Sequence, residues 1–403
     1  MARKKASKRP LVSPMPLIGI DIGGTLAKVV VYLPNKTSGK FKDFILSQTR
    51  YGKTGVREVD LEIKLKHGSI HIIKFLSSRV EYLDSIGLQD VVLSGPVYAT
   101  GGGAHKYADV LQTVMKASVK KFDEIECLAR GLRAMIKRED GCFSLANTRF
   151  GGDVGSDREK LWTVPVKVSP NNKGFIVVNI GSGVSFLHIK GDTYERIGGS
   201  SLGGSTFLGL CALLTGCDNF DEAIDLAANG DSAKVDMLVK DIYGEDMKGN
   251  LFGTLRPTTL AASFGKMLRK ERRLKARKED LALSTLIMCS MNVAAMAHIH
   301  AKHLGIKDIV FTGNFLATTH GLRSPQGTKN TDSIHLHAYE TLSLHKRNTV
   351  SMRILSYAVS FWSKKKKRAV FMKHEGCLGA IGALLHSGLQ LNTSQRSSGK
   401  AKL

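Results

Sequence analysis

The chain has 403 residues, 42% of them hydrophobic and 23% charged, which is ordinary for a globular protein and enough for two lobes that each bury a core. Its net charge of +24 comes largely from basic runs at 3–9, 269–278 and 364–368, which form solvated faces or attract anionic ligands. The six cysteines contain no C-x-x-C pair, and no zinc-finger spacing or RNA-binding aromatic signature occurs, so a disulfide framework, a zinc site and nucleic-acid binding are disfavoured.

The two ends of the chain favour flexible segments. Residues 1–16 are basic and contain prolines but lack the apolar core of a secretory signal, so a flexible arm is expected. Residues 389–403 are expected to form a flexible tail, and its last three residues, Ala401-Lys402-Leu403, are close to the S-K-L peroxisomal address. A cytoplasmic location and a peroxisome-type organelle both stay open. Ser, Asn and His residues interrupt the most apolar stretch, 281–301, which argues against a membrane span.

Residues 17–150 are expected to form a first lobe. Its opening strand ends in Asp21 and a glycine turn, and a second strand resumes at once, which predicts a β-hairpin. The expected elements are strands at 16–24, 27–33, 69–76 and 90–95 and helices at 104–117 and 122–136, the last with Asp123 as its N-cap. Residues 141–172 lack sustained periodicity and are expected to contain the lobe boundary.

The same strand, glycine turn, strand pattern returns in residues 173–388, the expected second lobe. Phe175 begins the sequence FIVVNIGSG, and two further strands follow. The later expected elements are helices at 205–215, 220–229, 234–243, 281–304, 350–363 and 376–385, strands at 308–315 and 370–373, and a loop insertion at about 317–347. The repeat predicts two related lobes that face each other across a cleft, with glycine turns that bind phosphates.

The segment DIGGTLAK at 21–28 has phosphate-binding chemistry. Gly23 and Gly24 let the backbone approach a polyphosphate, Thr25 can donate to its oxygens, and Lys28 can neutralise charge. Asp21 suits a hydrated Mg²⁺, which prefers few carboxylates and several waters. The segment is neither a P-loop nor a dinucleotide fingerprint, because a strand rather than a helix follows it. A hairpin turn with a solvated Asp is the alternative.

Phosphoryl transfer also needs a carboxylate that accepts the proton of the substrate hydroxyl. Asp123, Glu124 and Glu126 are candidates at the start of a helix, where they could equally serve only to complement the helix dipole. In the second lobe, the turn at 181–185 and the glycine-rich entry to a helix at 198–204 favour anions. Arg196 can pair with a carboxylate or phosphate, or be a solvated residue at a strand edge.

Six blocks resemble the eukaryotic-type (type II) pantothenate kinases in order and content. They are DIGGTLAK at 21–28, ATGGGAHKY at 99–107, VNIGSGVS at 178–185, GGSSLGGSTFLGLCALLTG at 198–216, DSAKVDMLVKDIYG at 231–244 and HEGCLGAIGALL at 374–385. The resemblance implies an α/β fold of two actin-like (ribonuclease H-like) lobes around an ATP cleft, as in the superfamily of sugar kinases, heat-shock ATPases and actin. It also implies phosphorylation of pantothenate with ATP and Mg²⁺, the first step of coenzyme A biosynthesis, feedback inhibition by acyl-CoA, and a homodimer.

The resemblance also implies roles for individual residues. Glu124 matches the general base, which selects it over its two neighbours, and Asp21 matches the metal-linked carboxylate, through water. The remaining matches are Gly23, Gly24, Thr25 and Lys28 for the triphosphate, Gly313 and Asn314 for the nucleotide, and Ser182, Ser185 and Arg196 for pantothenate and acyl-CoA. Residues 141–172 and 317–347 depart from the family pattern, and Cys377 replaces a usual aromatic residue, which bears on regulation more than on fold.

Two alternatives remain. One is a kinase of the same fold that acts on another hydroxylated metabolite, such as a sugar. The other is a nucleic-acid or partner-binding protein on an inactive kinase scaffold, which the charge of +24 would suit. The candidate catalytic carboxylate, Asp21 and both glycine turns argue against the second alternative.

Overall fold

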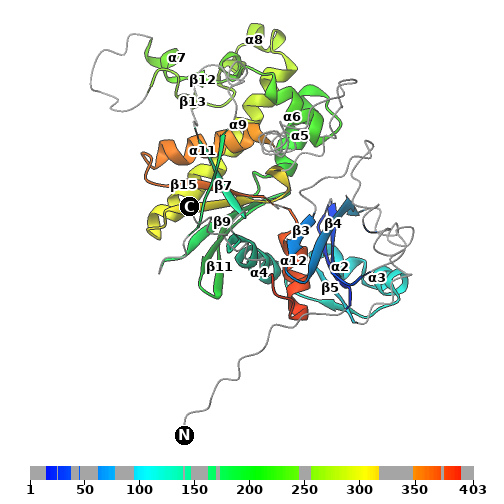
Figure 1. The fold of residues 1–403 in the computed structure, drawn as a ribbon. Helices are drawn as coiled ribbons and strands as arrows, with labels where there is room; N and C mark the ends of the chain where they lie inside the picture. The colour runs from blue at the N-terminus through cyan, green and yellow to red at the C-terminus, as the bar shows by residue number, and fades with distance from the viewer. Residues whose placement is uncertain are drawn as a thin grey trace, which may run out of the picture. The chain divides into compact units, whose positions relative to one another are not determined.

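A computed structural model describes residues 15–24, 26–37, 45, 62–77, 95–138, 141–146, 162–168, 173–244, 256–316, 348–373 and 376–391. These residues divide into two compact units, one with the residues up to Gly141 and from Gly376 onward, the other with those from Cys142 to Lys373 (Figure 1). The expected loop insertion at 317–347 and Ala401-Lys402-Leu403 lie outside the described residues, as do nearly all of the expected arm and tail.

The first unit is built on one mixed sheet whose strand order is β3-β4-β2-β1-β5-β6. Its strands are β1 (Leu17–Ile22), β2 (Leu26–Pro34), β3 (Glu62–Leu65), β4 (Gly68–Leu76), β5 (Val97–Thr100) and β6 (Val119–Lys121). Its helices are α2 (Gly102–Lys106), α3 (Ala108–Met115), α4 (Glu124–Ile136) and α12 (Leu378–Leu384), with a 3₁₀ turn, η9 (Leu385–Ser387), after the last. Apolar β1 and β2 side chains, with Leu111 and Met115 of α3, form its core.

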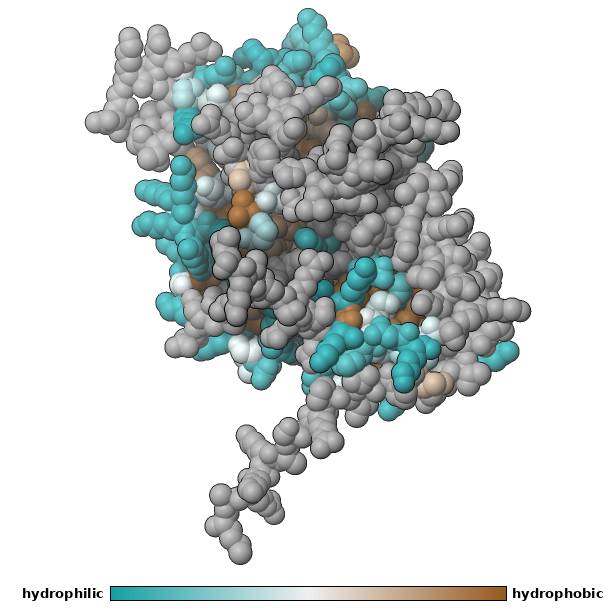
Figure 2. Space-filling model, in the orientation of Figure 1, coloured by the Kyte–Doolittle hydropathy of each residue, from teal (hydrophilic) through white to brown (hydrophobic). Residues whose placement is uncertain are grey.

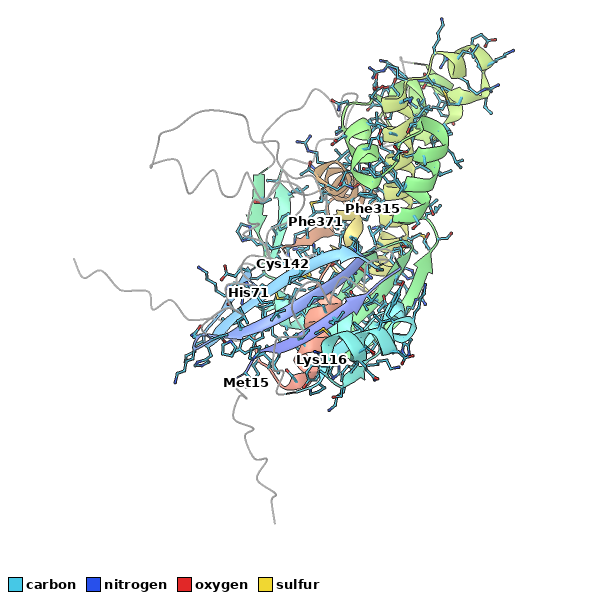
Figure 3. All side chains as sticks on the ribbon, turned by 90° about the vertical axis from the view of Figure 1, so that its right-hand side faces the viewer. Met15, His71, Lys116, Cys142, Phe315 and Phe371 are labelled. Atoms are coloured by element: carbon cyan, nitrogen blue, oxygen red, sulfur yellow. The ribbon has the colours of Figure 1, made fainter. Side chains whose placement is uncertain are left out.

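The second unit contains a seven-stranded sheet of order β11-β10-β9-β14-β15-β7-β8. Its strands are β7 (Cys142–Ala146), β8 (Trp162–Pro165), β9 (Phe175–Ile180), β10 (Val184–Lys190), β11 (Thr193–Ser200), β14 (Asp308–Thr312) and β15 (Arg368–Met372), and a separate pair is formed by β12 (Met237–Leu238) and β13 (Leu260–Ala262). Its helical elements are α5 (Gly204–Thr215), α6 (Phe220–Ala228), η5 (Ser232–Lys234), α7 (Val239–Tyr243), η7 (Gly265–Leu268), α8 (Lys270–Leu274), α9 (Lys278–His303), η8 (Asn314–Leu316) and α11 (Thr349–Trp362). Phe315 and Phe371, labelled in Figure 3, belong to its buried core.

The two units share one strand topology. In the first, β1 pairs antiparallel with β2 and parallel with β5, which pairs parallel with β6. In the second, β9 pairs antiparallel with β10 and parallel with β14, which pairs parallel with β15. Each hairpin continues into a third antiparallel strand, β4 or β11. This repeated arrangement is the ribonuclease H-like fold of actin-like proteins, so the predicted α/β class and internal duplication are confirmed.

The carboxyl-terminal helix belongs to the first unit, although it was expected in a second lobe ending at residue 388. Helix α12 packs against α4 and β1, and Figures 1 and 3 show it beside the first sheet. The division between the units also differs from the expected end of the first lobe at 150, because β7 pairs with β15 in the second sheet. Both differences depend on contacts between distant segments, which local sequence patterns do not reveal.

Several expected elements differ in their bounds. A single helix at 234–243 was wrong: only Val239–Tyr243 is α-helical there, because Met237 and Leu238 pair with β13. The helix expected at 104–117 is split at Tyr107 into α2 and α3. Of the strand expected at 90–95, residues 90–94 lie outside the described residues.

Helix α9 is long and apolar enough to meet the length and composition criteria for a membrane span, but 61% of its most apolar window is buried inside the protein. Its buried residues join the core of the second unit. This criterion is weak for a single helix, and a central core helix meets it equally well.

The basic runs that the structure describes are exposed. Residues 269–275, 277 and 278 are exposed around α8, and Figure 2 shows mainly hydrophilic residues in that region. Lys364, Lys365 and Lys366 are exposed after α11. These segments form solvated faces.

Candidate active site

In the first unit, Asp21 and Lys28 form an ion pair at the turn end of the β1–β2 hairpin. The hairpin register places the two residues directly opposite each other. Lys28 Nζ lies 3.1 Å from Asp21 Oδ2, and the side chains are only 8% and 13% exposed, respectively. A pair shielded to this extent loses solvation, which the short contact between the opposite charges offsets.

The glycine turn follows Asp21. The Gly23 amide donates to the Leu26 carbonyl at 3.0 Å, and the hydroxyl of Ser77, on the far side of the hairpin, donates to the Gly23 carbonyl at 2.7 Å. Gly24 is exposed, and a Cβ there would meet no atom within 4 Å. The turn therefore offers open backbone for an anion. Thr25 lies outside the described residues.

The start of α4 is tied to the strand next to Asp21. Strands β1 and β5 pair with Asp21 opposite Thr100, whose hydroxyl donates to the Phe122 carbonyl at 3.0 Å. The Phe122 amide donates to the Ala99 carbonyl at 2.9 Å. Asp123 is the N-cap, as predicted, and accepts from the Glu126 amide at 2.8 Å. These bonds place Glu124, the first residue of α4, in the vicinity of the Asp21–Lys28 pair.

The electrostatics of Glu124 reflect this position. Glu124 keeps contact with solvent, but nearby protein partly desolvates its carboxyl, which is the largest cause of its raised pKa. The charges of Asp21 and Asp123 raise the pKa further, whereas Lys28 and a backbone hydrogen bond from Gly102 lower it. A carboxyl whose pKa is raised in this way is a better proton acceptor than an ordinary surface glutamate.

Asp21 also bears on metal binding. Among the described residues, no group of three or more His, Cys, Asp or Glu side chains could hold a metal ion. A single carboxylate beside an open glycine turn fits Mg²⁺, which keeps most of its waters and takes its other ligands from phosphates. Asp21 would hold such an ion, which would supply charge neutralisation for a polyphosphate.

In the second unit, two turns and a helix start lie together. The Gly204 amide donates to the Gly181 carbonyl at 2.8 Å, and the Ser205 amide donates to the Ser182 carbonyl at 3.0 Å, so the β9–β10 turn abuts the start of α5. Gly313 follows β14, the parallel neighbour of β9, with a φ of 108° that only glycine adopts readily. Asn314 is half-buried at the start of η8.

Ser185 and Arg196 are brought to neighbouring positions on β10 and β11. Ser185 pairs with Gly199, whereas Arg196 pairs with Leu187, and a register shift separates the two pairs. A bulge of this kind changes the direction in which the side chains of a strand point. The Arg196 guanidinium crosses Gly199, because its Nη2 lies 2.9 Å from the position that a Cβ on Gly199 would take. Arg196 and Ser182 are exposed, so both are available to a ligand.

The predicted residues thus fall into two groups, one in each unit. The first contains Asp21, Gly23, Gly24, Lys28 and Glu124; the second contains Ser182, Ser185, Arg196, Gly313 and Asn314. Sequence reasoning missed the hydroxyls of Ser77 and Thr100, which hold the glycine turn and the start of α4. Each lies at or just after the end of a strand, and only the pairing of those strands reveals its role.

The repeated topology and the paired glycine turns define an actin-like fold of the nucleotide-binding class. The Fumble family matches residues 17–323 and 340–386. The chain belongs to this family, that of the eukaryotic-type pantothenate kinases. The internal gap in this match, residues 324–339, lies within the expected loop insertion.

Curated relatives agree with this assignment. The pantothenate kinase of Schizosaccharomyces pombe is 32% identical, covering 91% of this chain and 81% of its own length. Pantothenate kinase 2 of Arabidopsis thaliana is 32% identical. The match covers 91% of this chain but only 38% of the length of that relative. The 4'-phosphopantetheine phosphatase of Mus musculus is 34% identical and covers 94% of this chain, which spans 42% of it. Relatives within this family therefore carry names of different activities.

Solved structures show a more distant likeness. The activator of the 2-hydroxyisocaproyl-CoA dehydratase from Clostridium difficile with bound ADPNP is 14% identical, with a TM-score of 0.42 and coverage of 93% of this chain and 94% of that chain. A ROK family glucokinase from Streptomyces griseus is 10% identical, with a TM-score of 0.40 and coverage of 92% and 98%.

Proposed function

We propose that this chain transfers the γ-phosphoryl group of ATP to the hydroxyl of pantothenate, forming 4'-phosphopantothenate at the first step of coenzyme A biosynthesis. The observation that carries the proposal is the position of Glu124, whose carboxyl has a raised pKa and interacts with the Asp21–Lys28 pair beside an open glycine turn. Membership of a family with relatives named pantothenate kinases supplies the substrate.

In this proposal the first unit binds the phosphates of ATP and supplies the base that accepts the proton of the substrate. Gly23, Gly24 and Thr25 offer backbone and hydroxyl donors to the triphosphate, and Lys28 neutralises its charge. Asp21 would hold Mg²⁺ through water, and the ion would neutralise phosphate charge. Glu124 accepts the proton of the pantothenate hydroxyl as the phosphoryl group is transferred.

The second unit binds the remaining parts of the ligands. Gly313 and Asn314 contact the nucleotide. The backbone at Gly313 passes close to Ile180 at the end of β9, so these two residues lie beside the β9–β10 turn. Ser182, Ser185 and Arg196 contact pantothenate and, when it is present, acyl-CoA. The exposed guanidinium of Arg196 can form a charge-assisted hydrogen bond to the pantothenate carboxylate.

Replacement of Glu124 tests the proposed general base. Glu124→Gln should abolish pantothenate-dependent ADP release but leave ATP binding nearly intact, because only proton acceptance is lost. The pKa of Glu124 is raised on folding, so its ionised form opposes folding at neutral pH, and the variant should melt no lower than the parent. Glu279→Gln, in the first turn of α9, is the matched control and should keep its turnover. Near-normal turnover of Glu124→Gln would refute the assigned role.

We also propose feedback inhibition by acyl-CoA at the substrate-binding residues of the second unit. Arg196→Ala should weaken both pantothenate binding and inhibition by acetyl-CoA by about 2 kcal/mol, the typical contribution of a charged hydrogen bond. Lys190→Ala, which removes an exposed charge at the end of β10, is the control. Unchanged pantothenate KM and acetyl-CoA inhibition in Arg196→Ala would make Arg196 an ordinary surface residue.

A homodimer is part of the same proposal. Ile242, Tyr243 and Trp362 are large apolar side chains that are 51%, 49% and 47% exposed, and all three line one cavity of about 550 Å³ in the second unit. Exposed apolar side chains gathered around one cavity suit a surface that a second copy covers.

The inactive-scaffold alternative is the competing hypothesis, because not every relative is named a kinase. The mouse protein that matches 94% of this chain is named a phosphatase, so family membership alone does not assign kinase activity. The geometry of Asp21, Lys28 and Glu124 favours an active kinase, and the turnover measurements decide between the two.

A further inference from the structure

A stack of three flat rings holds the segment just before Glu124. Tyr98 of β5 stacks on Phe122, with ring centroids 6.1 Å apart and an interplanar angle of 18°. Phe122 stacks on His386 of η9, with centroids 3.9 Å apart and an angle of 14°. The stack joins the first sheet to the carboxyl-terminal turn, and Phe122 is its central ring.

Helix α4 supplies further partners for His386. Arg130 Nη1 lies 3.0 Å from His386 Nδ1 and 3.4 Å from Nε2, and Glu126 Oε1 lies 3.6 Å from Nε2. A guanidinium only donates, so a ring nitrogen of His386 accepts from Arg130, and the shorter of the two distances is to Nδ1. Burial first, and then the charge of Arg130, lower the pKa of His386, whereas Glu126 raises it. These surroundings favour the neutral form of the ring, and contacts on its face and edge fix its position.

These contacts restrain the start of α4 on several sides. The backbone of Phe122 is bonded to Ala99 and Thr100, its ring is held between Tyr98 and His386, and Arg130 is held to the same imidazole two turns further along the helix. Glu124 lies between these two attachments. A rotation of the first turn of α4 would move its carboxyl relative to Asp21 and would have to break the stack.

We propose that His386 is a positioning residue for Glu124, acting through its stack on Phe122 and its hydrogen bond with Arg130. The proposal rests on Glu124 as the general base of the proposed function. His386 contacts neither the glycine turn nor Asp21 in any described interaction, so its effect falls on the placement of the carboxyl. An error of about 1 Å in the placement of a reacting group can cost up to about a hundredfold in rate.

The test compares kcat and KM in the full chain. His386→Ala should lower kcat by about tenfold and change the KM values for ATP and pantothenate by less than about twofold, because binding is intact and positioning is lost. His386→Phe retains a flat ring and should recover kcat to within about threefold of the parent, and Phe122→Leu should behave like His386→Ala. Combining Phe122→Leu with His386→Ala should cost less than the sum of the two single changes, because both break the Phe122–His386 stack.

His188→Ala is the matched control. This half-buried histidine of the second unit lies with its Nε2 2.7 Å from the Lys173 carbonyl, so its loss also removes one hydrogen bond. It should leave kcat unchanged.

Three outcomes would overturn the inference: an unchanged kcat in His386→Ala, a fall that His386→Phe does not recover, or KM changes that account for the whole loss. If His386→Ala does not fold, the other two variants still test the inference, since His386→Phe must keep kcat within about threefold of the parent and Phe122→Leu must lower it.

The Glu124→Gln variant separates this inference from the proposed function. If Glu124→Gln retains turnover, the proposed base fails. If Glu124→Gln is inactive while His386→Ala matches the parent, only this inference fails.

Discussion

At the residue scale, the proposed site contains three carboxylates, those of Asp21, Asp123 and Glu124, and one lysine, Lys28. The charges of the two aspartates raise the pKa of Glu124, and the charge of Lys28 lowers it. Asp123 raises the pKa of Glu124, after the larger effects of desolvation and Asp21. Asp123→Asn removes that charge but keeps an acceptor for the Glu126 amide, since Asn is an equally good N-cap. The pKa of Glu124 should fall, and turnover requires its ionised form, so the acid limb of the kcat profile should move to lower pH.

The control for this shift is Asp109→Asn, which removes an exposed acidic residue from the first turn of α3 in the same unit. Its pH profile should overlay that of the parent. An acid limb that stays in place or moves to higher pH in Asp123→Asn would mean that Glu124 does not set it.

At the element scale, the close approach of α12 to β1 shapes the site. A Cβ on Gly379 would lie 2.9 Å from Asp21 Oδ2, closer than real Cβ contacts come, and 3.1 Å from Asp21 Cγ. Gly379→Ala should therefore displace the Asp21 carboxylate from Lys28 and lower turnover by about tenfold or more, as expected for misplaced catalytic groups. Turnover and thermal melting of the variant, measured side by side, check this prediction.

Gly209→Ala is the matched control on helix α5. A Cβ there would meet no atom within 4 Å, and the residue is exposed. Alanine in a helix should stabilise the protein by about 0.5–1 kcal/mol and leave turnover unchanged. Equal turnover in the two alanine variants would show that the approach of α12 does not constrain Asp21.

At the scale of the whole molecule, the proposed homodimer should cover the exposed apolar side chains of the second unit. Light scattering should give a mass of about twice the 43.8 kDa of one chain. Trp362→Glu places a charge among these side chains and should shift the protein to monomer, whereas Leu213→Glu, at an 85% exposed position outside the cavity, should not. A parent that is monomeric at assay concentration contradicts the proposed assembly.

Local patterns predicted much of the fold and of the local structure around Gly23 and Asp123. The hairpin around Gly23 and the cap at Asp123 were predictable, because turn glycines and N-cap residues act within a few positions of themselves. The return of α12 to the first unit was not, because Gly379 and Asp21 are more than three hundred positions apart in the chain. The contact of Phe122 with His386 escapes sequence reasoning for the same reason.

The most direct test of the central claim is ADP release from MgATP by the purified chain, with pantothenate or with a panel of sugars, each with and without acetyl-CoA. The account predicts turnover that requires pantothenate and falls when acetyl-CoA is added. Turnover with a sugar alone would contradict the substrate, and absence of turnover with every acceptor would contradict the kinase itself.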